Sequence, residues 1–296
     1  KWLFESDHSV LKAVDQGKKL EMQRFRQGKP VKQLTFDYPP DSAPLEIIGP
    51  RGLGAEDLVG RLESPNGSVR ETAQRLILER RDRNAVPRLE SLARDVERNA
   101  ARATALWTLH ALGALRPELL ATALEAGEAR VRETALRVAR EGKEQVARVR
   151  SRLAGLIWDA DPGVRLQVVL ALGDMRDPDG VLVRSEALAA AVRRDAADPW
   201  IVSAALSSSR GAESFLVHRL LQVETGGEGR AKGEEAVLAV AREVAALAGA
   251  SDEPDAIQSI LADAGRLLDA GGPSRAFAAA DGLAAGADRR VPGRAA

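Results

Sequence analysis

From residue 55 onward, apolar residues recur at the spacing of amphipathic helices, and short polar turns separate the apolar runs. The stretch 159–174, DADPGVRLQVVLALGD, shows this pattern most clearly: an Asp-Pro helix start, a Val-Arg step and an Ala, Val and Leu stripe. Partial copies occur on both sides of it. The pattern predicts consecutive helix–turn–helix units at 55–81, 85–113, 117–141, 145–174, 180–208 and 211–249.

Aligning the second helix of each unit reveals a repeat. An arginine column appears at Arg70, Arg102, Arg132 and Arg165, with gaps of 32, 30 and 33 residues. The preceding column is Val69, Ala101, Val131, Val164 and Ile201. Three positions after each arginine lie Ala73, Ala105, Ala135 and Val168, with Ala205 in the fifth unit. Such a period with two helices per unit is typical of an α-solenoid, in which each pair buries its apolar stripe against its neighbours.

The two ends of the chain follow other patterns. Alternation predicts a hairpin of Ser9–Asp15 and Lys19–Phe25 around Gln16-Gly17, with a third strand at Val31–Tyr38; a helix within Val10–Phe25 is the alternative. The runs 39–44 and 49–54 indicate a linker, and residues beyond 270 are rich in Ala and Gly. We therefore expect a β-containing segment at 1–54, an all-α solenoid of about six to seven helix pairs at 55–270, and a tail or cap at 271–296.

Composition narrows the possible functions. Basic and acidic residues balance at 43 each, which gives the chain no overall attraction for nucleic acid or anionic lipid. No cysteine is present, so disulfides and thiolate chemistry are excluded. No apolar run is long enough for membrane insertion. Because the chain begins at Lys1, we expect a processed product or a fragment.

The arginine column has two interpretations. We favour a structural ladder, in which each arginine pairs with an acidic side chain of its own or the next layer, as Arg165 could with Asp161. A groove that binds an acidic partner is the alternative.

A second column lies five residues further on and contains Arg75, Trp107 and Arg137. Helical geometry turns Trp107 away from the apolar stripe of its helix, with His110 one turn later. Because tryptophan and arginine favour binding hot spots, Arg75, Trp107, His110 and Arg137 are our candidate partner-binding residues. Packing of Trp107 against a neighbouring repeat is the alternative.

Motifs for catalysis, metals and cofactors are missing. The three histidines, His8, His110 and His218, are scattered, and no H-E-x-x-H occurs. The Gly-rich runs 49–54 and 226–233 lack the spacing of a phosphate-binding loop. We expect no catalytic residue, no metal site and no cofactor.

The Asp-Pro openings and Val-Arg steps over 55–250 resemble HEAT repeats. In their order, the segments 64–92, 105–115, 129–141, 161–178 and 195–208 resemble the HEAT region of the PVC-type haem-binding, membrane-bound dehydrogenase-like proteins. These are exported bacterial proteins with a β-propeller before the array and a c-type haem domain after it. The resemblance implies that residues 1–38 are the last propeller strands and that the compartment is the periplasm or cell envelope. No C-x-x-C-H site is present, so no redox residue carries over.

The resulting hypothesis is a non-catalytic scaffold that binds a protein partner or neighbouring domains of the same polypeptide. One alternative is a HEAT-like nucleic-acid-binding protein similar to the alkylpurine DNA glycosylases, since 35 of the 43 basic residues are arginine. Neutral charge and few aromatic residues count against nucleic acid. A bilin-lyase-like HEAT protein is a second alternative, supported by the shared repeat type alone.

Overall fold

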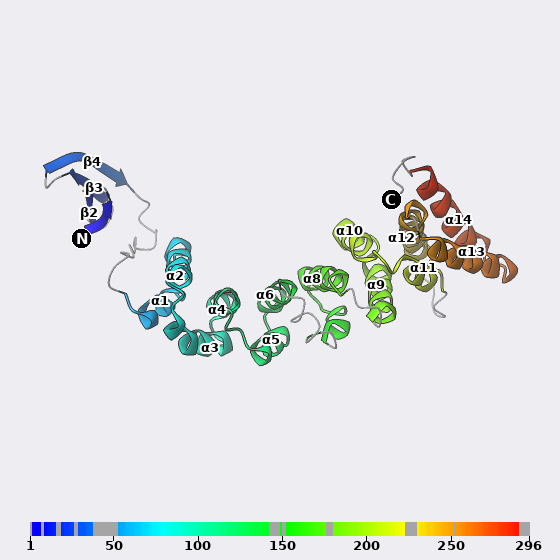
Figure 1. The fold of residues 1–296 in the computed structure, drawn as a ribbon, viewed down its shortest axis with the longest axis horizontal. Coiled ribbons are helices and arrows are strands. Elements are labelled where there is room, and N and C mark those ends of the chain that lie inside the picture. Colours follow the sequence, from blue (N-terminus) through cyan, green and yellow to red (C-terminus); the bar gives the residue numbers. More distant parts are fainter. Residues whose placement is uncertain are drawn as a thin grey trace. The chain divides into compact units, whose positions relative to one another are not determined.

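The computed structural model describes residues 2–6, 9–15, 19–26, 29–37, 53–141, 149, 152–175, 180–222, 230–251 and 253–289 (Figure 1). Contacts divide the chain into two compact units, Lys1–Thr134 and Ala135–Ala296. From Leu53 onward the regular structure of the described residues is entirely helical, so this part of the chain is an all-α protein with a helical-repeat-like architecture.

Four strands precede the helices in the first unit. They pair in sequence order as an antiparallel meander, with Val10 opposite Phe25 and Leu20 opposite Phe36. The strands are β1 (Trp2–Ser6), β2 (Ser9–Asp15), β3 (Lys19–Arg26) and β4 (Lys29–Asp37).

The helices of the first unit lie in two layers. Helix α3 contacts both α1 and α5, while α2 contacts α4, so alternate helices stack on one another. Side chains and prolines fix where these helices begin: Asn66 accepts a hydrogen bond from the Ser68 N–H, and Pro117 opens α5. The helices are α1 (Ala55–Arg61), α2 (Gly67–Arg80), η1 (Arg83–Ala85), α3 (Val86–Arg94), α4 (Asn99–Ala111) and α5 (Pro117–Leu124).

The second unit repeats this arrangement. Helix α11 contacts α9 and α13, and the other layer runs from α8 through α10 and α12 to α14. Helix α6 (Ala129–Arg140) begins in the first unit and ends in the second. The remaining helices are α8 (Pro162–Gly173), α9 (Val181–Asp195), α10 (Pro199–Ser208), α11 (Glu213–Leu221), α12 (Arg230–Ala250), α13 (Pro254–Asp269) and α14 (Pro273–Asp288).

The apolar columns of the sequence form the core. Every branched or small residue of the column before the arginines, from Val69 to Ile201, is buried. The column three positions after the arginines, from Ala73 to Ala205, is buried as well. The period read from the sequence therefore correctly predicted which face of each second helix packs inward.

Glycines determine how the last helices pack. A Cβ atom added at Gly282 would collide with the Arg242 carbonyl oxygen, and one at Gly286 would collide with that of Ala246. On the opposite helix, a Cβ atom at Gly249 would collide with the Leu283 carbonyl oxygen. Helices α12 and α14 therefore touch backbone to backbone, which only glycine permits at these positions. From the Ala/Gly-rich composition beyond residue 270 we expected a tail or cap. This region contains the packed helix α14.

Candidate functional site

The arginine column binds main-chain carbonyl groups. Arg70 Nη1 donates to the carbonyl oxygens of Ser64 at 2.7 Å and Pro65 at 3.0 Å. Arg132 Nη1 makes the same pair of contacts to Ala126 at 2.7 Å and Gly127 at 2.9 Å. In each case a guanidinium near the start of the second helix of a pair donates hydrogen bonds to carbonyl groups that follow the first helix of that pair.

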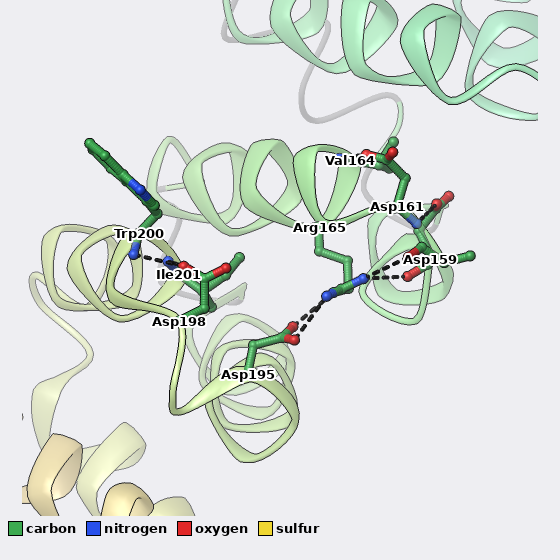
Figure 2. Close-up of polar contacts among 9 residues, drawn as sticks. Asp159, Asp161, Val164, Arg165, Asp195, Asp198, Trp200 and Ile201 are labelled. Atoms are coloured by element: carbon green, nitrogen blue, oxygen red, sulfur yellow. Dashed lines mark hydrogen bonds and ion pairs between the residues drawn. The ribbon is translucent and has the colours of Figure 1, made fainter.

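Arg165 makes these contacts and adds an acidic one. Its Nη1 donates to the carbonyl oxygens of Asp159 at 2.9 Å and Ala160 at 3.0 Å. Its Nε and Nη2 donate to the two carboxylate oxygens of Asp195 at 2.7 and 2.8 Å, a bidentate pair (Figure 2). The hydrogen bonds to Asp195 raise the pKa of Arg165, against the lowering effect of burial.

Two further buried arginines bind carbonyl groups: Arg102, which belongs to the arginine column, and Arg184, which does not. Arg102 donates to the carbonyl oxygens of Ala93 at 2.9 Å and Thr122 at 3.5 Å, which joins α3 to α5. Arg184 donates to Met175 at 2.6 Å and Arg210 at 3.3 Å, next to the C-terminal ends of α8 and α10. Burial lowers the pKa of Arg102, which here binds carbonyl groups. Arg102, Arg165 and Arg184, which are buried, each join the ends or turns of successive helix pairs.

These contacts correct the ladder interpretation in one respect. We expected acidic partners, but Arg70 and Arg102 donate to carbonyl oxygens. Arg165 does have an acidic partner in the adjacent helix pair, as the ladder predicted, but this partner is Asp195 and not Asp161. The Asp161 carboxylate accepts a hydrogen bond from the Val164 N–H at 3.1 Å and caps α8. The pKa of Arg165 is raised chiefly by the hydrogen bonds to Asp195, and the negative charge of Asp161 makes the smallest contribution.

The proposed partner-binding residues fall in different places. Trp107 and His110 are half-buried on α4, with ring centroids 6.1 Å apart in an edge-on arrangement. Arg75 is exposed on α2 and forms an ion pair with Glu79 at 3.3 Å. Arg137 is exposed on the part of α6 that belongs to the second unit. The structure thus brings Trp107 and His110 together.

Near the first helix pairs is a hollow of about 400 Å³. Its wall contains Glu63, Arg70 and Arg98. Arg98 Nη1 lies 3.1 Å from the Glu63 carboxylate, and Arg70 is bound to carbonyl groups of the same wall. The other Glu63 oxygen, Oε1, is buried and accepts no hydrogen bond, with Arg88 Nη2 3.6 Å away.

A histidine–carboxylate pair joins α11 to α13. His218 Nδ1 lies 3.0 Å from the buried Asp263 carboxylate, which also accepts from Arg266. His218 Nε2 is 2.8 Å from Gln222 Nε2, so that ring nitrogen is already occupied. The pair therefore links two neighbouring helices of the same layer. Among the described residues no three potential ligands come together as a metal site would require.

Two exposed aromatic residues near helix starts were not among the predicted site residues: Trp158 in the turn before α8 and Trp200 in the first turn of α10. Trp158 is 62% exposed and Trp200 is 73% exposed, and each adjoins an Asp-Pro helix start. The Arg194 guanidinium lies 5.8 Å from the Trp158 ring centroid, a cation–π contact. A tryptophan directly beside a helix start has no place in the buried stripe, and this signal could have identified both residues from the sequence.

Comparisons with known proteins do not assign this chain to a family. No protein-family profile matches the chain, and no curated protein is significantly similar to it. No helix among the described residues combines the length and apolar character that crossing a bilayer requires.

Proposed function

We propose that this chain is a HEAT-type α-solenoid that acts as a non-catalytic scaffold and binds a protein partner or neighbouring domains of its own polypeptide. The supporting observation is the set of buried arginines: Arg102, Arg165 and Arg184 each join the ends or turns of successive helix pairs. Such fastening suits a rigid repeat array whose loops are left to carry recognition.

The larger setting rests on the resemblance. The order of the repeat segments is similar to that of the HEAT region in the PVC-type dehydrogenase-like proteins. On this proposal, the strands at 2–37 are the last part of a β-propeller, and the solenoid spaces catalytic domains of an exported bacterial redox protein.

The nucleic-acid alternative receives no support from the arginines. This alternative rests on the abundance of arginine, yet Arg70, Arg102 and Arg165 are bound to carbonyl groups within their own repeats. Arg184 and Arg193 donate to carbonyl groups as well. We expect no mobility shift of a DNA duplex at low salt, and a shift that weakens as salt is added would favour this alternative instead.

Two measurements test the scaffold proposal. Native mass spectrometry and the absorption spectrum of the purified chain should show the polypeptide alone. Haem, flavin, quinone or metal bound in stoichiometric amount would contradict the proposal. Cross-linking in the source cell should join the interhelix loops of the tagged chain reproducibly to the same protein, with a denatured sample as the control.

A further inference from the structure

Two exposed indoles lie near the starts of α8 and α10: Trp158 in the turn that precedes α8, and Trp200 in the first turn of α10. We define the tryptophan edge as residues 158–161 and 194–200, which include Trp158 and Trp200. Burying an aromatic side chain is worth about 1.5–3 kcal/mol, and the fold leaves this stabilisation unused at both positions. Neither ring is needed to fill the core.

The tryptophan edge is held in place by the Arg165 contacts. Arg165 joins the carbonyl groups of residues 159 and 160 to the Asp195 carboxylate, three residues before the cap of α10. Arg194 adds a second link by lying over the Trp158 ring. Figure 2 shows the Trp200 ring pointing away from the Arg165 cluster. The edge is thus preorganised, and binding there would require little ordering of the loops.

The chemistry of the edge favours a cation. Its carboxylates are Asp159, Asp161, Asp195 and Asp198, and its own cation is Arg194. Buried Arg165 pairs with Asp195, and the carboxylates of Asp161 and Asp198 accept main-chain N–H groups at the starts of α8 and α10. The Trp158 ring already accepts a guanidinium, so the edge itself demonstrates this mode of contact.

We propose that the tryptophan edge binds an arginine-rich extended segment of a protein partner, with a guanidinium on the Trp200 ring and carboxylate contacts from Asp161 and Asp198. Planar guanidinium groups stack on indole and pair with carboxylates in the same complex, which lysine does less well. This inference rests on the scaffold function and specifies where that function is exerted and for what partner chemistry.

The experiment titrates the full chain at low salt with an arginine–glycine peptide, followed by calorimetry and tryptophan fluorescence. A lysine–glycine and a glutamate–glycine peptide of equal length serve as comparisons. We expect the arginine peptide to bind most tightly and the glutamate peptide not to bind. No binding of the arginine peptide, or equal binding of the glutamate peptide, would overturn the inference.

Variants locate the contact. Trp200→Ala should weaken binding roughly tenfold, as loss of a hot-spot tryptophan does. Asp198→Asn retains a good helix cap while removing the charge, so it should weaken binding severalfold and reduce its salt dependence. Phe277→Ala is the matched control, because this side chain is 66% exposed on α14, outside the edge. Equal losses in Trp200→Ala and Phe277→Ala would contradict the assigned site.

Failure here is distinguishable from failure of the scaffold proposal. If the arginine peptide does not bind but the purified chain carries no cofactor, the scaffold proposal stands and the tryptophan edge is not its arginine-binding surface. If instead the chain self-associates with concentration and Trp200→Ala abolishes this, the occupant is a second copy, which overturns the proposed partner.

Discussion

The helices around Arg165 and the helices α12 and α14 solve the same packing problem in opposite ways. Around Arg165, branched residues such as Val164 and Val168 fill the core, the Arg165 side chain joins α8 to the end of α9, and only at the far end of α8 does a glycine, Gly173, pack closely against Ser208 of α10. Between α12 and α14, glycines let the backbones touch. The arrangement around Arg165 depends on hydrogen bonds at the helix ends. The arrangement of α12 and α14 depends on the missing side chains of the glycines where the two backbones touch.

The largest expected effect comes from Arg165→Met. Removing the guanidinium leaves the poorly exposed Asp195 carboxylate and two carbonyl groups without their donor. We expect urea unfolding to show a loss of about 3–5 kcal/mol. The control is Arg75→Met, which breaks an exposed ion pair and should change stability by less than about 1 kcal/mol. Similar losses in both variants would show that the buried contacts add nothing.

Gly286→Ala tests the other arrangement. A methyl group has no space against the Ala246 carbonyl, so α14 must move away from α12, at a cost of about 1–3 kcal/mol. Gly265→Ala is the matched control, because it lies within α13 with nothing close to an added Cβ atom. There, helix propensity should raise stability by about 0.8–1 kcal/mol. Thermal unfolding of the two variants should shift in opposite directions.

Asp161 distinguishes a cap from an ion pair. As the cap of α8, it should tolerate replacement by asparagine with little change, whereas Asp161→Ala should cost about 1 kcal/mol. An ion-pair role would make both variants equally damaging, since both remove the charge. Chemical unfolding of the two variants provides the measurement.

The smallest effect is expected for the cation–π contact. Arg194→Gln removes the guanidinium from the Trp158 ring at an exposed site, which should cost about 0.5–1 kcal/mol. A double-mutant cycle with Trp158→Ala isolates the pair. A coupling energy of zero would mean that the two side chains are neighbours without attraction.

The stacked helices could be predicted from the sequence because apolar side chains recur at fixed positions in each repeat. The columns from Val69 and Ala73 had to be apolar to be buried, and they are buried. The partners of Arg70 and Arg102 could not be predicted, because a carbonyl oxygen belongs to every residue and leaves no trace in the sequence. The backbone contact of α14 was hidden for a related reason: glycine-rich composition is also typical of tails.

The candidate sites differed in the same way. Helical periodicity placed Trp107 on the face of α4 that is half-buried beside His110. Trp158 and Trp200 lie outside the stripes that the periodicity describes, and the proximity of Trp158 to Arg194 follows from the folded loops. A periodic pattern locates what repeats, and the tryptophan edge is a departure from the repeat.

The carbonyl contacts of the arginine column have a consequence for how such a chain can diversify. The same Nη1 geometry holds Ser64-Pro65, Ala126-Gly127 and Asp159-Ala160, which are three chemically unrelated dipeptides. A main-chain oxygen is indifferent to the side chain next to it. The turns can therefore exchange their residues while the arginine that fixes them stays the same, so the surface of this helical array can change without a change in the contacts that support it.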